Sequence, residues 1–489
     1  MIQKELLTGR GAGRCSVVRQ SLSISVHEVK LYQYWRQFLL QLAQEVSLPD
    51  RDEASEEGER DAPGIAPVFR GKAALLQNLP GKSHVLEELR PVPKGSRRKG
   101  MPDTNDQEEG VRPLHMKVMP TPRSVDISIT RRCNLRCTYC SHFESDAHIG
   151  EDLDTAEWLR FFQELGRCRV MRVTLGGGEP FCRRDLPVLL QGITENRMRF
   201  TLLSNGTLIT DAAAAAVART GRCDAVQISI DGSTAESHDL FRGRGTFVRA
   251  VEGIRSLQRH GVPVTVRVTI HQGNVHDLPG IMKFLLDDLK IPVVSTNAAS
   301  YLGKCRQHED TVGLSIEEQV VAMEHLVQLS HAYPGRIHAT AGPLADARMW
   351  REMTEAKYHT GNGQAAPGRG YLSGCGCTAT SLSVRSDGAI VPCVQLNHIV
   401  LGTIGTGCFE EIWLNHPQLQ RLRMRHSIPL STFAECRECP YITACTGGCP
   451  ALAYTRTGEL DRPSPDGCFK RFLEAGGRLP VEREGEDDA

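Results

Sequence analysis

A loop that carries three closely spaced cysteines constrains this chain more than any other feature of its sequence. Cys133, Cys137 and Cys140 follow directly after a run of residues typical of a β-strand, at 124–130. Because the gaps between the cysteines are three and two residues, one short loop can direct all three thiolates at a single small cluster. A zinc site or a complete iron-sulfur site takes four protein ligands. A 4Fe-4S cluster with three protein ligands keeps one iron open, so the loop predicts a metal centre that also binds a substrate or cofactor.

The composition of the chain excludes several classes of protein. Its 489 residues suffice for about two to four domains and a buried core. Lys and Arg together number 58, as do Asp and Glu, so no overall field favours nucleic acid or a membrane surface as a partner. The apolar stretches are too short to span a bilayer, and no signal-peptide pattern opens the chain. We therefore expect a cytoplasmic protein whose 17 cysteines mostly bind metals in a reducing compartment.

Residues 1–115 differ in composition from the rest of the chain. Apart from an apolar run at 31–46, they are rich in Glu, Arg, Gly and Pro, and long stretches have the composition of a linker. We predict a poorly patterned N-terminal extension. Two functional alternatives are a docking module for a leader peptide and a partner-binding arm, and a third possibility is a gene start placed too early.

From residue 124 onward, short β-branched runs alternate with amphipathic helical patterns. Strands are predicted at 124–130, 171–175, 200–204, 225–230, 264–270 and 293–296. Helices are predicted at 155–168, 185–194, 211–220, 248–260, 278–289 and 315–332. Six strand–helix units in series imply an α/β fold with a parallel sheet, either open and doubly wound or curved into a partial barrel. In both, active residues lie on loops at the carboxyl ends of the strands, where the cysteine loop is found.

A Gly-Gly-Glu-Pro turn ends the second predicted strand. Gly177 and Gly178 allow the backbone to approach a ligand closely, and the carboxylate of Glu179 can accept a hydrogen bond from an ammonium group. Such a turn is a weak signal by itself. Polar residues also end the third and fourth predicted strands, and the alternative interpretation for them is a turn that closes the strand. A His-Asp-x-x-Arg stretch follows the fourth strand, and the alternative for its Arg242 is a surface salt bridge.

The cysteine loop, with Tyr139 before its third cysteine, resembles the signature of the radical S-adenosylmethionine (SAM) enzymes, in which a Gly-Gly-Glu-Pro turn follows one strand–helix unit later. The resemblance implies a partial (β/α)6 barrel over residues 119–335, with a SAM-binding 4Fe-4S cluster on Cys133, Cys137 and Cys140. It assigns Gly177, Gly178 and Glu179 to the methionyl amino group of SAM. The further residues that it assigns to SAM, or in one case to SAM or substrate, are Ser204, Asn205, Ser229, Asp231 and Arg242.

A second group of cysteines occupies the C-terminal third: Cys375, Cys377, Cys393, Cys436, Cys439, Cys445, Cys449 and Cys468. Their spacing resembles the seven-cysteine SPASM domain, predicted here at 370–475 and followed by a charged tail at 476–489. The resemblance implies two auxiliary iron-sulfur clusters. One would be held by Cys377, Cys393 and Cys449, with Cys375 as a further candidate whose gap to Cys377 is unusually short. The other would be held by Cys436, Cys439, Cys445 and Cys468. Two structural zinc sites are the rival interpretation.

These resemblances lead to a functional prediction. We expect an enzyme that cleaves SAM reductively to a 5′-deoxyadenosyl radical and abstracts hydrogen from a peptide or protein substrate, with auxiliary clusters that carry electrons or tether the substrate. An external electron donor of the flavodoxin or ferredoxin type is expected, and neither nucleic acid nor a membrane. One alternative replaces the peptide by a tetrapyrrole. Another, from a different class, is a non-catalytic iron-sulfur or zinc scaffold.

Overall fold

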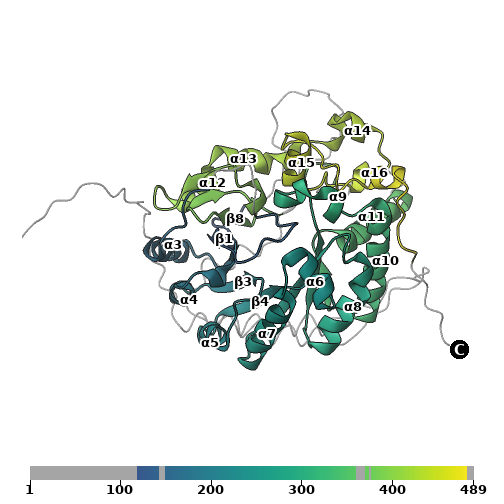
Figure 1. Cartoon of the computed structure of the whole chain (residues 1–489). Coiled ribbons are helices and arrows are strands. Elements are labelled where there is room, and N and C mark those ends of the chain that lie inside the picture. Colours follow the sequence, from purple (N-terminus) through teal and green to yellow (C-terminus); the bar gives the residue numbers. More distant parts are fainter. Residues whose placement is uncertain (1–117, 143–148, 360–368, 374–375, 482–489) are drawn as a thin grey trace, which may run out of the picture. The chain divides into compact units, whose positions relative to one another are not determined.

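The computed structural model describes residues 118–142, 149–359, 369–373 and 376–481 (Figure 1). The predicted extension at 1–115 and Cys375 lie outside these ranges. By its internal contacts the chain divides into Met1–Gly110 and Val111–Ala489, and the fold described below belongs to the second unit.

A ten-stranded sheet runs through the described part of the chain in the order β10-β9-β8-β1-β2-β3-β4-β5-β6-β7. The strands are β1 Ser124–Thr130, β2 Arg172–Gly177, β3 Arg199–Ser204, β4 Cys223–Ser229, β5 Val264–Ile270, β6 Val294–Ala298, β7 Ile337–Ala339, β8 Ser381–Val384, β9 Ala389–Val391 and β10 Gly402–Thr403. Strands β1 to β7 are all parallel and neighbour one another in chain order. Since β7 and β10 are its edges, the sheet is an open, partial barrel.

Helices follow the parallel strands and cover their outer face (Figure 1). Those of the core are α3 Thr155–Arg167, α4 Leu186–Glu195, α5 Asp211–Arg219, α6 Ala235–Arg242, α7 Thr246–Arg259, α8 Leu278–Lys283, α9 Glu309–Val312, α10 Ile316–Ala332 and α11 Pro343–His359. The C-terminal region adds α12 Phe409–Asn415, α13 Pro417–Met424, α14 Ala434–Arg437, α15 Pro450–Thr457 and α16 Phe469–Glu474.

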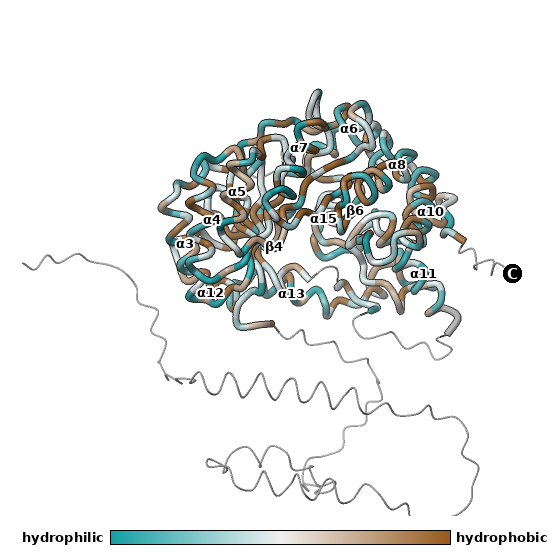
Figure 2. The backbone as a smooth tube through the Cα atoms, turned by 90° about the horizontal axis from the view of Figure 1, so that it is seen from below, coloured by the Kyte–Doolittle hydropathy of each residue, from teal (hydrophilic) through white to brown (hydrophobic). Residues whose placement is uncertain are grey.

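The first of these helices shows why the sequence folds this way locally. Asp154 caps α3: its side chain accepts from the amide of Glu157 at 2.7 Å, and the Glu157 side chain accepts from the amide of Asp154 at 2.9 Å. The helix then buries Trp158, Phe162 and Leu165 against the sheet. Figure 2 shows the same arrangement for the whole unit, with apolar strands inside and polar helix faces outside.

Residues along β5 alternate between the two faces of the sheet. Val264, Val266 and Val268 are buried in the apolar core, whereas Thr265 and Arg267 between them are only partly buried. Because the core helices pack on the apolar face, the polar residues point to the inner, concave face. The inner face of the barrel is therefore polar, as a binding site for a charged small molecule requires.

Every element predicted for this region is present, while strand β7 and helices α9 and α11 were not predicted. All six predicted strands and six predicted helices are present, and their ends differ from the predicted ones by no more than two residues. The exception is the helix predicted at 278–289, which is α-helical to Lys283 and then continues as a π-helical turn, Phe284–Asp288. The short helix α6 was not predicted as an element.

The C-terminal region joins the same sheet, which the sequence did not predict. Strand β8 pairs in parallel with β1, in a register that places Ile127 opposite Val384, and β9 and β10 extend the sheet as antiparallel strands. Helix α12 packs on α3, where the rings of Phe161 and Phe409 meet edge to face with their centroids 5.7 Å apart. The cysteine-rich region is thus anchored beside the strand that leads into the cysteine loop.

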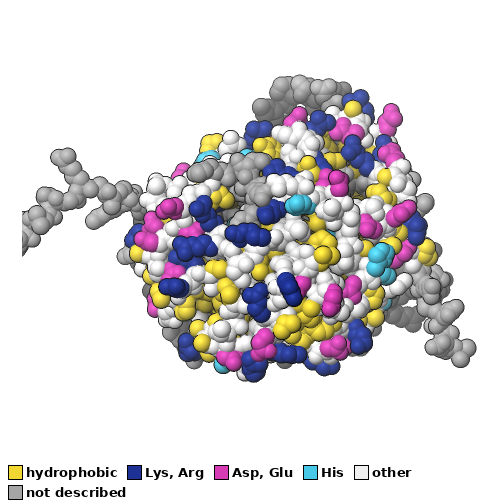
Figure 3. Space-filling view, viewed as in Figure 1, with side chains coloured by type: hydrophobic (Ala, Val, Ile, Leu, Met, Phe, Trp, Pro, Cys, Tyr) yellow, Lys and Arg dark blue, Asp and Glu magenta, His cyan; other side chains and the backbone are white. Residues whose placement is uncertain are grey.

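Two surface properties complete the description. No helix among the described residues combines the length and apolar character that crossing a bilayer needs. The face shown in Figure 3 carries acidic and basic side chains interspersed with one another, in keeping with the equal numbers of the two in the sequence.

Candidate active site

The cysteine loop after β1 is held against the turn after β2. The amides of Gly178 and Glu179 donate to the carbonyls of Thr130 and Arg132, at 2.8 and 2.7 Å. A side chain at Gly178 would place its Cβ 2.1 Å from the carbonyl oxygen of Arg132, and Gly177 has φ +108° with a virtual Cβ 2.5 Å from the carbonyl oxygen of Thr130. Both glycines are therefore required for the turn to approach the cysteine loop, a reason beyond the ligand approach that the sequence suggested.

The three cysteines of the loop lie together and are half-buried. Burial raises the pKa of the Cys133 thiol to about 11, and the nearby Glu179, Cys137 and Cys140 raise it further. Burial also raises the pKa of Cys137, while the guanidinium of Arg242 opposes that shift. Thiols with raised pKa values stay protonated until a metal binds, so cluster assembly here must release protons. Three convergent thiols with a basic side chain beside them fit a cluster with one open iron.

Glu179 is almost completely buried beside this loop, with 1% of its surface exposed. Burial raises its pKa to about 6, although three donors lower it: the amide of Asn205 at 2.7 Å, the amide of Phe181 at 3.2 Å and the hydroxyl of Ser204 at 2.8 Å. The side-chain amide of Asn205 also lies 3.9 Å from the sulfur of Cys133. The structure thus brings Cys133, Glu179, Ser204 and Asn205 together, and the last residue of β3 and the residue after it orient the Glu179 carboxylate.

Asp231 and Arg242, both predicted to contact SAM, form an ion pair inside the protein. The Nε of Arg242 donates to Asp231, and so does the hydroxyl of Tyr139 from the cysteine loop. The amide of Thr269 donates to the other carboxylate oxygen at 2.8 Å. Burial raises the pKa of Asp231, but the Arg242 guanidinium holds it below its usual value. Arg242 is 8% exposed, so the alternative of a surface salt bridge is wrong, and the pair fixes the cysteine loop through Tyr139.

Ser229 lies opposite Arg267, a candidate site residue that was not predicted from the sequence. In the sheet, Ser229 on β4 pairs with Arg267 on β5, and Arg267 pairs with Ser295 on β6, to whose hydroxyl it donates at 3.3 Å. Burial lowers the pKa of Arg267. Among the described residues no carboxylate lies within ion-pair distance of its guanidinium. The sequence signal was a single cation on the polar face of an otherwise β-branched strand.

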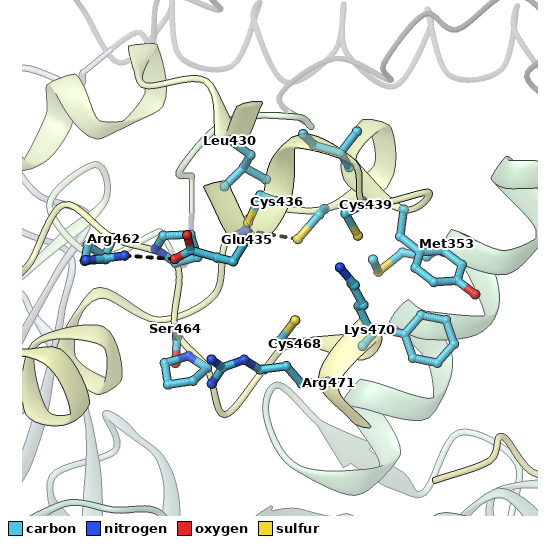
Figure 4. Close-up of a pocket in the computed structure, with 18 of the residues that line it drawn as sticks. Met353, Leu430, Glu435, Cys436, Cys439, Arg462, Ser464, Cys468, Lys470 and Arg471 are labelled. Atoms are coloured by element: carbon cyan, nitrogen blue, oxygen red, sulfur yellow. Dashed lines mark hydrogen bonds and ion pairs between the residues drawn. The ribbon is translucent and has the colours of Figure 1, made fainter. Parts of the chain in front are cut away.

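Four of the C-terminal cysteines surround one cavity of about 440 Å³. They are Cys436, Cys439, Cys445 and Cys468, and Figure 4 shows three of them converging on its interior together with Lys470. Burial raises the pKa of Cys436 to about 12, and the other three thiols raise it further. Four thiols around one cavity fit a 4Fe-4S cluster with complete protein ligation.

The remaining cysteines lie nearer to the first loop. Cys377 and Cys449 both lie close to the buried guanidinium of Arg425. The sulfur of Cys393 accepts from the amide of Gln395 at 3.5 Å, and the Gln395 side chain donates to Ser141 at 3.3 Å. Ser141 directly follows Cys140, so the segment with Cys393 touches the loop predicted to bind SAM.

Comparison with known proteins agrees with this geometry. The sequence model of the Radical SAM superfamily matches residues 127–285, and that of the SPASM iron-sulfur cluster-binding domain matches residues 375–440. The chain is 30% identical to pre-heme d1 synthase of Dinoroseobacter shibae over 376 residues, which are 74% of this chain and 90% of that protein. It is 24% identical to PqqA peptide cyclase of Granulibacter bethesdensis, over 72% of this chain and 88% of that protein. The crystal structure of Streptococcus suis SuiB bound to precursor peptide SuiA superposes with a TM-score of 0.57 at 14% identity, covering 90% of both chains.

A three-cysteine loop and a thiol-lined cavity on a partial α/β barrel define an iron-sulfur enzyme that uses SAM. The chain belongs to the radical SAM superfamily and carries a C-terminal SPASM domain. Its cofactors are therefore 4Fe-4S clusters and SAM, and neither the zinc nor the non-catalytic scaffold alternative is supported. Bound together, the first cluster and SAM supply a 5′-deoxyadenosyl radical through one-electron cleavage of a carbon-sulfur bond.

Proposed function

We propose that the protein abstracts hydrogen from a residue of a peptide or protein and that its auxiliary clusters carry away the electron of the substrate radical. The observation that carries the proposal is that the C-terminal region holds two sets of cysteines in addition to the SAM loop. One set surrounds a cavity, and the other includes Cys377 and Cys449, which act electrostatically on Arg425. The similarity to PqqA peptide cyclase supports a peptide substrate. An external donor of the flavodoxin or ferredoxin type supplies the first electron in the cytoplasm, and neither nucleic acid nor a membrane takes part.

Within this proposal the residues of the inner face divide the binding of SAM among them. Cys133, Cys137 and Cys140 hold the first cluster, and the Glu179 carboxylate accepts from the amino group of SAM. Arg267 is a cation without a carboxylate partner among the described residues, one strand from Ser229, and the carboxylate of SAM is an anion of suitable size for it. Gly177 and Gly178 set the approach of the turn, while Ser204, Asn205, Asp231 and Arg242 orient these groups.

A tetrapyrrole is the second candidate substrate. The observation that favours it is the 30% identity to pre-heme d1 synthase, which is higher than the identity to the peptide cyclase. In this version the barrel and the cofactors stay the same, and the substrate changes from an amino-acid residue to a macrocycle. The two candidates differ in what stimulates SAM cleavage.

The test is a substrate panel applied to anaerobically reconstituted protein. Peptides translated from short reading frames next to the gene and a set of porphyrin precursors are each incubated with protein, SAM and a reductant. We expect one such peptide to change in mass and to raise the yield of 5′-deoxyadenosine, and the porphyrins to have no effect. Conversion of a porphyrin without change to any peptide would replace the first candidate by the second. Boiled protein and protein without SAM are the controls.

A further inference from the structure

Arg425 is a buried cation whose guanidinium makes no hydrogen bond with the described residues. It begins the 3₁₀ turn Arg425–Ser427 after α13, and only 2% of its side chain is exposed. The lack of a hydrogen bond holds for all three of its guanidinium nitrogens. Burying donors of a charged group without acceptors costs several kcal/mol or more. A native protein keeps such a group only where a further partner completes it.

Asp461 does not fully supply that partner. The closest approach between the two side chains is 3.6 Å, longer than a hydrogen bond. Asp461 already accepts two hydrogen bonds from the exposed Arg421, at 2.9 and 3.2 Å, through the oxygen that faces away from Arg425. Its other oxygen, Oδ1, lies 3.6 Å from Nη1 of Arg425 and has no hydrogen-bond partner among the described residues either. Asp461 can therefore engage Nη1 of Arg425, and it leaves Nε and Nη2 without an acceptor.

Two predicted cluster ligands act electrostatically on Arg425. Burial lowers the pKa of Arg425, and the groups that oppose this shift are Asp461 followed by the thiols of Cys449 and Cys377. The backbone explains the proximity. The amide of Leu372 donates to the carbonyl of Ile428 at 3.0 Å, so the segment with Arg425 runs alongside the segment that leads into Cys377.

A second backbone contact brings the loop with Asp461 to the other cysteine. The amide of Ser464 donates to the carbonyl of Gly447 at 2.8 Å, two residues before Cys449. Arg425 is therefore enclosed between the two cysteine segments, with bulk solvent excluded. Among the described residues, Asp461 and the thiols of these two cysteine segments are the groups that can carry negative charge beside Arg425.

We propose that the guanidinium of Arg425 donates hydrogen bonds to the sulfur atoms of the auxiliary cluster held by Cys377, Cys393 and Cys449, and thereby raises the reduction potential of that cluster. This inference rests on the proposed function for the existence and ligands of the cluster. A cluster gains negative charge when it accepts an electron, so a fixed cation and N–H donors stabilise the reduced form more than the oxidised form. The cluster with Arg425 then accepts an electron from a substrate radical more readily than the four-thiol cluster near Lys470.

The experiment is a redox titration followed by electron paramagnetic resonance, on full-length reconstituted protein. Addition of SAM changes the signal of the first cluster and so separates it from the auxiliary ones. Arg425→Gln should shift the potential of one auxiliary cluster to more negative values, by at least a tenfold change in the one-electron equilibrium, or about 59 mV. Asp461→Asn, which removes a negative charge from the same environment, should shift it in the opposite direction.

Arg423→Gln is the matched control. Arg423 is also buried and lies in the same segment, but its Nε donates to the carbonyl of Thr378 at 2.8 Å and its guanidinium lies over the ring of Trp413 at 4.5 Å, so that Nη2 is its only buried guanidinium nitrogen without a hydrogen-bond partner among the described residues. We expect this variant to lose stability and to shift the potential much less than Arg425→Gln. If Arg425→Gln does not fold, Arg425→Lys keeps the charge, has fewer donors and should give a smaller negative shift.

The outcomes separate this inference from the proposal beneath it. Wild-type protein with the iron of a single cluster would refute the auxiliary clusters themselves. Auxiliary clusters whose potentials are the same in wild type and in Arg425→Gln, or shift equally in Arg423→Gln, would refute the role of Arg425 and leave the clusters standing. Formation of 5′-deoxyadenosine without substrate should persist in all these variants.

Discussion

The two cysteine regions of this protein are built in different ways. The SAM loop takes three ligands from eight consecutive residues at the end of β1, and backbone hydrogen bonds from the next strand hold it in place. The C-terminal ligands are spread from Cys377 to Cys468, on or between helices and strands of only two to eight residues. The first region stands on a continuous apolar sheet, whereas the second depends on loop contacts, on buried arginines and, we expect, on its clusters. We therefore expect the metal clusters of the second region to stabilise its fold as well as to take part in the chemistry.

The strongest test of this division removes the ligands of the first region alone. The triple variant Cys133→Ala, Cys137→Ala, Cys140→Ala should lose all reductive cleavage of SAM, because no other described loop offers three thiols beside Glu179. The auxiliary iron should remain, since the two ligand sets lie in separate segments. The measurements are 5′-deoxyadenosine yield with dithionite and iron per chain. Wild-type yield from this variant would move the SAM site elsewhere.

The converse variant removes two ligands from the second region. With Cys436→Ala and Cys439→Ala, SAM cleavage without substrate should survive, while the amount of true product per 5′-deoxyadenosine falls several-fold. The reason is electron balance: after hydrogen abstraction the substrate radical must lose one electron, and an auxiliary cluster accepts it. An unchanged ratio in protein that has lost only this cluster would make the four-thiol cluster structural and leave electron transfer to the cluster of Cys377, Cys393 and Cys449. Cys223→Ala, a cysteine on β4 remote from both sets, is a suitable control.

Whether a feature of either region could be predicted from the sequence depends on how far apart along the chain its interacting residues lie. The cysteine loop, Glu179 and the six strands could be predicted, because each depends on a short motif or a local period and parallel strands bring their ends to one edge. The pairing of β8 with β1 could not, since it joins residues more than 250 apart through backbone hydrogen bonds that leave little trace in the sequence. Arg267 and Arg425 were missed for the same reason: their meaning comes from neighbours on other strands or loops.

A smaller effect is expected from the inner face of the barrel. Arg267→Met keeps much of the side-chain volume but removes the charge, so the affinity for SAM should fall by roughly 10- to 100-fold, the usual cost of one charged hydrogen bond at about 1.5–3 kcal/mol. Iron content and fold should not change. Calorimetry or equilibrium dialysis on the reconstituted protein measures the affinity. If SAM binds as before and only substrate turnover suffers, Arg267 contacts the substrate instead.

The smallest effect concerns the helix that connects the two regions. In α11, Trp350 stacks on Phe469 and Phe472 of α16, at 5.1 and 4.7 Å, and Asp346 lies one turn earlier on the same helix. Burial raises the pKa of Asp346 from 3.8 to about 7. Between these two pH values the folded protein keeps a proton that the unfolded chain has lost. The contribution of Asp346 to the free energy of unfolding is therefore most favourable below pH 4. It falls as the pH rises from about 4 to about 7, by at most about 1.4 kcal/mol per unit of pH, and changes little once the pH has passed the folded-state pKa. Asp346→Asn should remove this component, so that denaturant midpoints at pH 6 and pH 8 differ less than in wild type.

The control Asp288→Asn, at a largely exposed carboxylate of the core, should leave the wild-type pH dependence intact. Equal pH profiles for wild type and Asp346→Asn would mean that the carboxylate is hydrated or paired in solution, and that the junction between the core and the cluster region does not respond to pH through this residue.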